Sequence, residues 1–199
     1  MQRFFWIFLG LIFLVGGCGY FQGKSTYNNM VVQQEAVEAQ WGQVQNVYQR
    51  RADLIPNLVE TAKGYAEFEQ SILTDVAEAR AQVGQLTVTK EVLDDPQALE
   101  RFNNAQSALG NTLSRLLSVA ENYPELKANS NFQALMVELE GTENRIAVER
   151  KKFNDAARAY NSFIKQFPNN LYAGLFNFEE VAYFRAEAGS EQAPKVSFD

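Results

Sequence analysis

Residues 132–167 read FQALMVELEGTENRIAVERKKFNDAARAYNSFIKQF and carry an aromatic or aliphatic residue at every seventh position. Two turns of an α-helix take about seven residues, so these side chains line one face of a helix. A heptad kept over the whole stretch is typical of a helix that packs lengthwise against another helix. The stretch therefore predicts a long core-facing helix that ends at Phe167-Pro168. The heptad positions are Phe132, Leu139, Ile146, Phe153, Tyr160 and Phe167.

Two further apolar stripes with helical spacing precede this stretch. One runs from residue 27 to about residue 85, with Gly64 as a candidate break. The other begins after Asp95, since an acidic residue before Pro96 is a helix start signal, and it ends before Pro124. Over residues 25–186 the pattern predicts an all-α, antiparallel bundle of three to four long helices with coiled-coil-like packing. Members of the first stripe include Tyr27, Met30, Val37, Trp41, Val44, Tyr48, Ile55, Leu58, Ala62, Tyr65, Ile72 and Ala79.

The chain after the last long stripe is rich in aromatic residues between residues 171 and 184. Two interpretations stay open for it. The segment either folds back and caps the bundle, or docks on another molecule. Residues 187–199 are predicted to form a flexible C-terminal tail because they lack an apolar pattern.

The N-terminal residues 4–21, FFWIFLGLIFLVGGCGYF, form an uncharged run of eighteen residues. Such a run is near the lower limit for a helix that spans a bilayer. Its dense part also has the length of the apolar region of a secretory signal, and its Leu-Val-Gly-Gly-Cys end resembles a lipoprotein site with Cys18 as the lipid attachment residue. Residues 1–22 are therefore predicted to be a membrane anchor, either a single-pass helix or a lipoprotein signal. Arg3 favours a cytoplasmic N-terminus, with the helical body on the extracytoplasmic, periplasmic side.

Composition excludes several classes of function. The 199 residues contain no histidine and one cysteine, so imidazole catalysis, histidine metal sites, internal disulfides and multi-cysteine zinc sites are all excluded. The formal net charge is −6 and no long basic run occurs, which argues against nucleic acid as a partner. No phosphate-binding loop or nucleophile motif is present either. We therefore expect no enzyme activity, no catalytic or metal-binding residue and no cofactor.

Arg51 breaks the first stripe, because it occupies a position that should face the core. A buried guanidinium without a partner is costly, so we expect an ion pair with an acid of the third helix. The candidate partners are Glu138, Glu140 and Glu143. The pair would fix the register of the helices. Alternatively, the arginine would bind an anion or a carboxylate of a partner.

Pro56 lies inside the same stripe and removes one backbone hydrogen-bond donor. We expect a kink there, which either bends the helix around the core or shapes a docking surface, and Asn57 could bond the freed backbone group. Together with its neighbours it defines a candidate interaction or structural motif. The motif comprises Arg50, Arg51, Asp53, Pro56, Asn57, Glu143 and Arg145.

Residues 48–69, YQRRADLIPNLVETAKGYAEFE, resemble the LemA family, as do the blocks at residues 120–132 and 138–150. The resemblance extends in order over about residues 25–185. It implies a short N-terminal membrane anchor and an all-helical body outside the cytoplasm. Some members are linked to membrane metalloproteases or to envelope organisation. The resemblance supplies no catalytic residues.

Three functions remain open at this point. The first is a membrane-tethered, non-enzymatic scaffold or interaction protein of the bacterial cell envelope, which would bind a protein partner or self-associate. The expected helices differ in length, so one end should protrude and carry apolar residues that a partner would cover. The second is an accessory subunit of an envelope protease or another membrane enzyme. The third is a membrane-shaping protein.

Overall fold

The computed structural model describes residues 2–65, 69–86 and 91–185. These residues form helices and, within those three ranges, no strand, so the all-α prediction is confirmed. The side chains of residues 2–4, 8, 11, 12, 15, 18, 91 and 94 lie outside the description, as does the tail predicted at 187–199. The helices are α1 (Gln2–Lys63), α2 (Gln70–Gln85), α3 (Glu91–Asp94), α4 (Pro96–Ala120), α5 (Pro124–Ala128), α6 (Ser130–Lys165) and α7 (Asn169–Phe176).

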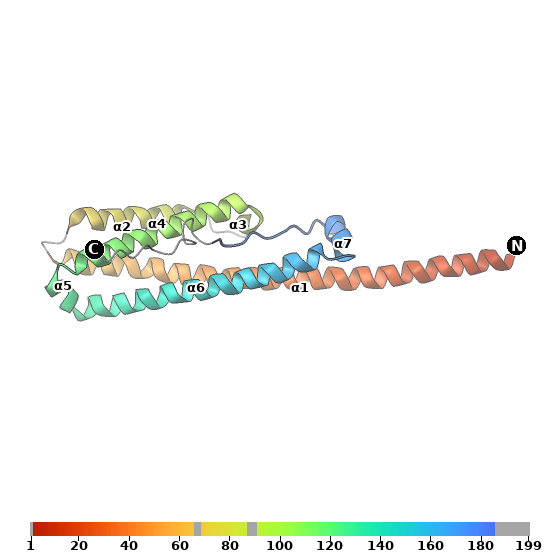
Figure 1. The fold of residues 1–199 in the computed structure, drawn as a ribbon, viewed down its shortest axis with the longest axis horizontal. Helices are drawn as coiled ribbons and strands as arrows, with labels where there is room; N and C mark the ends of the chain where they lie inside the picture. Colours follow the sequence, from red (N-terminus) through yellow and green to blue (C-terminus); the bar gives the residue numbers. More distant parts are fainter. Residues whose placement is uncertain (1, 66–68, 87–90, 186–199) are drawn as a thin grey trace, which may run out of the picture.

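The longest element, α1, is one continuous helix of 62 residues. At about 1.5 Å per residue it is about 93 Å long. Its N-terminal part projects well beyond the other helices (Figure 1), and the helix runs without interruption through the boundary predicted between residues 22 and 25. Among the residues that the structure describes, no helix is both long and apolar enough to cross a membrane.

The helix α1 ends at Lys63, directly before Gly64, the candidate break. A Cβ atom at this position would lie 3.3 Å from the carbonyl oxygen of Thr61, which is a tight approach for any other residue. The chain then turns, and α2 packs against both α1 and α4. The apolar series that begins in α1 is therefore shared between two helices, with Ile72 and Ala79 buried on α2.

Pro96 opens α4 as the sequence indicates. The side chain of Asp95 accepts a hydrogen bond of 2.8 Å from the backbone N–H of Gln97, which satisfies one free donor of the first turn. The helix ends at Ala120, three residues before the predicted end at Tyr123, and the short α5 starts at Pro124. The apolar stripe of α4 faces inward, with Phe102, Leu109 and Leu116 buried.

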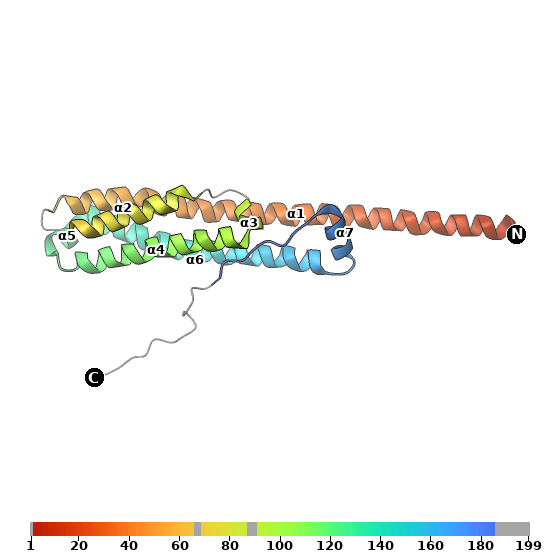
Figure 2. The same ribbon diagram turned by 90° about the horizontal axis from the view of Figure 1, so that it is seen from above.

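The heptad of the opening stretch is buried along α6 from Phe132 to Tyr160. This helix lies beside α1 in two perpendicular views (Figures 1 and 2) and makes its most extensive packing with it. The last heptad position was predicted wrongly, because α6 ends at Lys165 and the side chain of Phe167 is 82% exposed. Once the helix has ended, the spacing no longer places that ring on the core face.

After α7 the chain folds back onto the helices, as one of the two interpretations of the aromatic segment predicts, and buries Val181 and Phe184, whereas Leu171, Leu175 and Phe176 stay exposed. Asn177 caps α7 in the left-handed conformation, with φ of 56°, a geometry that asparagine tolerates better than most residues. Residues 178–185 then run without regular structure toward α4 and α6. Phe184 ends up buried against Trp41 and Phe153, with ring centroids 5.9 and 5.4 Å away.

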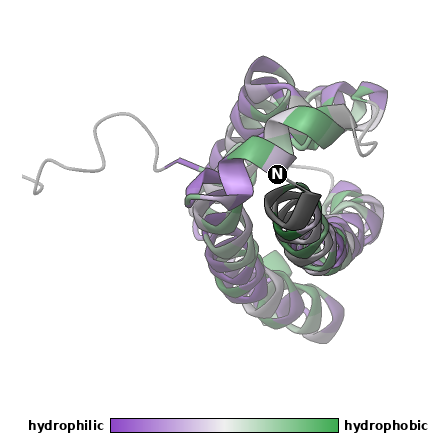
Figure 3. Ribbon diagram, turned by 90° about the vertical axis from the view of Figure 1, so that its right-hand side faces the viewer, coloured by the Kyte–Doolittle hydropathy of each residue, from purple (hydrophilic) through white to green (hydrophobic). Residues whose placement is uncertain are grey.

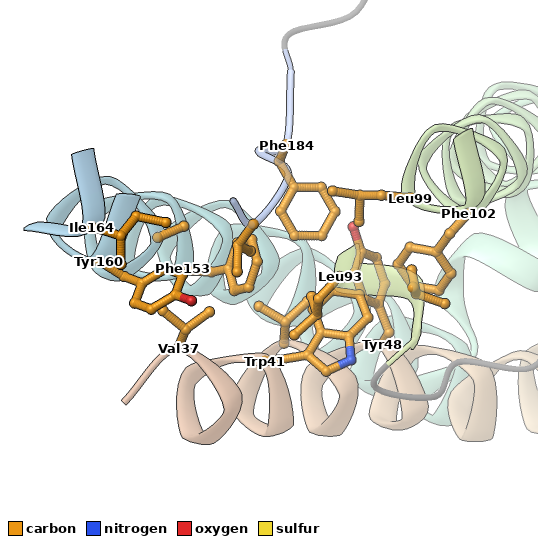
Figure 4. Packing of buried hydrophobic residues seen from close by; sticks show 14 of the residues in the cluster. Val37, Trp41, Tyr48, Leu93, Leu99, Phe102, Phe153, Tyr160, Ile164 and Phe184 are labelled. Atoms are coloured by element: carbon orange, nitrogen blue, oxygen red, sulfur yellow. The ribbon is translucent and has the colours of Figure 1, made fainter. Parts of the chain in front are cut away.

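Most of the buried aromatic rings gather in the half of the core that is formed by α1, α4 and α6 (Figure 4). Trp41 lies 5.7 Å from Phe102 and 5.6 Å from Phe153 between ring centroids, and Tyr48 lies 5.1 Å from Phe102. The other half of the core is mainly aliphatic and includes Leu58, which is fully buried. Seen along the long axis (Figure 3), hydrophilic and hydrophobic stretches alternate along the helices, as expected of amphipathic helices.

Candidate functional site

Arg51 lies at the middle of the body and is 2% exposed. Its Nη1 donates to Oε2 of Glu143 at 2.9 Å, and its Nη2 donates to the backbone carbonyl of Gln106 at 3.1 Å and to the side-chain oxygen of the same residue. The guanidinium also lies 5.2 Å from the ring centroid of Tyr48. One buried arginine of α1 therefore joins α4 and α6.

The predicted ion pair thus has Glu143 as its acid, while Arg50 pairs with Glu138 at 2.6 Å. The two neighbouring arginines of α1 take two of the three candidate glutamates of α6. Burial differs sharply across the inner pair, because the side chain of Arg51 is 3% exposed and that of Glu143 is 58% exposed. The charge of the arginine is therefore balanced from the rim of the helical body rather than from inside it.

The remaining members of the candidate motif do not join this group. Asp53 is exposed and accepts a local hydrogen bond of 2.7 Å from Gln49. Arg145 lies on an exposed part of α6, and Asn57 is exposed on α1. Cys18 belongs to α1, but its side chain lies outside the described residues.

The backbone group freed by Pro56 is the carbonyl of Ala52, one turn earlier in the helix. Nε of Arg80, on α2, donates to this oxygen at 3.0 Å. A side chain of the neighbouring helix therefore supplies the donor, rather than Asn57 as the sequence suggested. This contact was missed because nothing in the local spacing connects residues 28 positions apart.

A groove of about 400 Å³ lies beside Arg51. Burial raises the pKa of Tyr48 on its wall above the usual tyrosine value, and the nearby guanidinium groups of Arg150 and Arg51 oppose this rise. The groove combines hydrogen-bond donors with carboxylates, so it offers a polar rim over an apolar floor. It is lined by Tyr48, Arg51, Gln106, Ser107, Gly110, Asn111, Leu113, Ser114, Leu117, Met136, Leu139, Glu140, Glu143, Ile146 and Arg150.

Two asparagines of α6 hold the returning chain against this helix. The side chain of Asn161 donates to the carbonyl of Val181 at 2.8 Å and accepts from its N–H at 2.9 Å. Asn154, seven residues earlier, makes the same pair of bonds to Phe184, both at 2.9 Å. The sequence pattern showed the heptad but not these amides, because they lie beside the apolar positions.

Comparison with known proteins adds a family to this geometry. The model of the LemA family matches residues 40–198. The chain belongs to the LemA family. The match to the LemA family includes every member of the candidate motif from Arg50 to Arg145, and it begins after Cys18.

Individual relatives point the same way. Magnetosome protein MamQ of Magnetospirillum gryphiswaldense is 28% identical over 181 residues, which cover 83% of this chain and 66% of that protein. Protein LemA of Metamycoplasma hominis is 24% identical over 186 residues, 94% of this chain and 80% of that protein. The chain thus spans slightly less than two thirds of the MamQ protein and most of the LemA protein.

Within the described residues, no group of three or more histidine, cysteine, aspartate or glutamate side chains is arranged to hold a metal ion. Arg51, which the LemA match includes, bonds to groups of the protein itself, and only its Nε has no hydrogen-bond partner within the described residues. The arrangement in this LemA-family chain is therefore suited to joining three helices and to presenting a polar rim at the surface.

Proposed function

We propose that this protein is a membrane-tethered scaffold of the bacterial cell envelope. A helical bundle with no enzyme activity of its own would stand on an N-terminal anchor on the extracytoplasmic side. Its surface would bind a protein partner or a second copy. Membership of the LemA family and the similarity to MamQ and LemA support a membrane-associated envelope protein.

The observation that carries this proposal is the N-terminal part of α1. It projects from the body (Figure 1) and carries large apolar side chains that no other described element covers. An added Cβ atom at Gly10, Gly16 or Gly17 would meet nothing within 4 Å. A helix with apolar residues around its circumference belongs in a membrane rather than in water. The exposed apolar residues are Phe5, Trp6, Ile7, Phe13, Leu14, Tyr20 and Phe21.

Intact mass of the protein isolated from membranes tests the anchor. A mass that starts at Met1 supports an inserted helix, and a mass that starts at Cys18 with added lipid supports a lipoprotein. Carbonate washing of membranes then separates tethered from loosely bound protein. Release of the full-length chain by carbonate, together with an unmodified mass, would refute the tether.

Sidedness needs a reporter far from the anchor, and Val137 is suitable because it is exposed on α6. A membrane-impermeant maleimide should label the Val137→Cys variant in intact spheroplasts more strongly than it labels the parent chain. Both proteins contain Cys18, so the difference between them reports residue 137 alone. Labelling that requires lysis would place the body in the cytoplasm and contradict the proposal.

In-cell cross-linking followed by mass spectrometry tests the scaffold role. Cross-links to a second copy or to a protein without enzymatic activity support it. A dominant cross-link to a membrane protease would favour an accessory subunit instead. Loss of all cross-links under conditions that preserve other envelope complexes would remove the basis for a scaffold.

A further inference from the structure

We propose that α7 and the turn before it form a second membrane contact, which lies in the lipid–water interface beside the point where α1 enters the bilayer. This inference rests on the membrane tether proposed above. We call the contact the collar and define it by four residues: Phe167, Leu171, Leu175 and Phe176.

The collar is apolar and open to solvent. Its four side chains are 82%, 62%, 71% and 47% exposed, in the order of their numbers. Residues 166–178 contain no charged residue, although 21% of the whole chain is charged. Elsewhere on α2 to α6, large apolar residues that are exposed within the described part are confined to Val137 and Val148. The exposed apolar surface of the body is thus concentrated at one end.

That end is the one from which the anchor emerges. The ring of Tyr172 packs so closely on α1 that a Cβ at Gly23 would lie 3.0 Å from it, and its hydroxyl donates to the carbonyl of Gly19 at 3.4 Å. The rings of Phe176 and Tyr27 have centroids 5.0 Å apart. Both views in Figures 1 and 2 place α7 beside α1 where α1 leaves the other helices.

The depth of the collar follows from these contacts. The apolar run ends at Phe21, inside the segment of α1 that α7 touches. Eighteen helical residues span about 27 Å, close to the thickness of the hydrocarbon core of a bilayer, about 30 Å. If the run is inserted, the end at Phe21 lies at the interface, and the collar lies at the same level. If Cys18 carries lipid instead, Gly19 is next to the acyl chains and the collar is again at the surface.

The chemistry of the collar suits a bilayer interface. Helices that lie in the membrane interface bury Phe and Leu side chains at the boundary between the headgroups and the acyl chains, and the collar consists of these two residue types. Tyr20 and Phe21 of α1 add two exposed rings at the same level. Lys24 is exposed just after the uncharged run of α1 and would face the headgroups, whereas Lys165 forms an ion pair of 2.6 Å with Glu180. A lipid surface is therefore the occupant that the anchor itself brings to this face.

Site-specific spin labelling of the full-length chain tests the collar. Single cysteines would replace Ile7, Leu175 or Val137 in a Cys18→Ser background, and each protein would be reconstituted into vesicles of phosphatidylethanolamine and phosphatidylglycerol. The readout is the accessibility of the nitroxide to oxygen, which enriches in lipid, relative to a water-soluble nickel chelate. Ile7 reports the anchor, Leu175 the collar, and Val137 the distant surface.

We expect the ratio of oxygen accessibility to nickel-chelate accessibility to be several-fold higher at Leu175 than at Val137, and higher still at Ile7. Adding Leu171→Asp should return the Leu175 label to the aqueous value, whereas adding Val137→Asp should leave it unchanged. An aqueous Leu175 label with an inserted Ile7 label overturns the collar and leaves the tether intact. An aqueous Ile7 label refutes the inserted helix on which the depth of the collar depends. A Leu175 label that is protected only in native membranes would assign this face to a protein partner and also overturn the proposal.

Discussion

Arg50 and Arg51 are neighbours in sequence, yet they lie in different surroundings. Arg50 forms its ion pair at the surface, where both side chains are about half exposed. Arg51 is buried and bonds to Glu143 and to two oxygens of Gln106. Exposed pairs contribute little to stability, whereas removing one partner from a buried network leaves the others without a bond.

We therefore expect Arg51→Ala to lower the free energy of unfolding by about 3 kcal/mol, and Arg50→Ala by less than about 1 kcal/mol. Urea unfolding followed by helical circular dichroism measures both. Arg51→Met keeps most of the side-chain volume and should cost less than Arg51→Ala, since it leaves a smaller cavity. If Arg51→Ala and Arg50→Ala lowered the free energy of unfolding equally, the buried network would contribute no more to stability than the exposed ion pair.

Tyr48 gives a pH-dependent prediction. Burial raises its pKa above the usual value of 10.0, so the folded protein holds the phenol proton more tightly than the unfolded chain does. The resulting stability is fully present below the unfolded pKa and is lost as the pH rises through the folded pKa. The melting temperature of the wild type should therefore fall relative to that of Tyr48→Phe above about pH 10. If the melting temperatures of the two proteins changed in parallel from about pH 8 to about pH 11, this prediction would be contradicted.

At the scale of the helices, α1 tolerates a proline in its interior because α2 compensates for it. Proline removes the donor for the carbonyl of Ala52, and Nε of Arg80 takes its place at 3.0 Å. The contact links the two helices that flank the turn at Gly64. The carbonyl group that Pro56 leaves without a donor in α1 is thus used for a hydrogen bond between α1 and α2.

The two residues should be energetically coupled. We expect Arg80→Ala to cost about 1 kcal/mol in the parent chain and almost nothing in Pro56→Ala, where the backbone N–H of residue 56 serves the same carbonyl. Pro56→Ala alone should stabilise the protein by about 1 kcal/mol. A double-mutant cycle by urea unfolding measures the coupling. Arg115→Ala, which breaks an exposed 3.2 Å ion pair with Asp75, is the control and should cost the same in both backgrounds.

At the scale of the whole molecule, the described side chains in the first part of α1 show no packing against the body. Exposed apolar residues and open space around Gly10, Gly16 and Gly17 mark this part, and contacts with α7 begin at Gly19. The structure therefore accommodates the unequal lengths of the predicted helices in two ways. The first stripe breaks at Gly64, and the opposite end of α1 protrudes.

Deleting residues 2–17 should change the free energy of unfolding in mild detergent by less than about 0.5 kcal/mol. Deleting residues 2–27 should lower it by about 2 kcal/mol. The longer deletion removes the ring of Tyr27 from Phe176 and Phe178, whose centroids lie 5.0 and 5.6 Å away. Denaturant unfolding in the same detergent compares the three proteins. A large loss from the shorter deletion would mean that the projecting helix folds back onto the body.

The sequence by itself determined the helices and their inward faces. Asp95 and Pro96 start α4 where the capping signal predicts, and the heptad from Phe132 to Tyr160 is buried throughout. These features depend on the helical repeat and on end groups within a few residues, and local spacing contains both. The same rule failed at Phe167, because the spacing continued after the helix had ended.

Tertiary structure alone decided which residues meet. It selected Glu143 from three candidate acids for Arg51, brought Arg80 to the carbonyl freed by Pro56, and set Asn161 against the backbone of Val181. It also placed α7 beside the base of the projecting helix. These partners lie between 20 and more than 90 residues apart in sequence. Periodicity shows which face of a helix is buried, but the helix that covers this face depends on the turns and the packing of the entire chain.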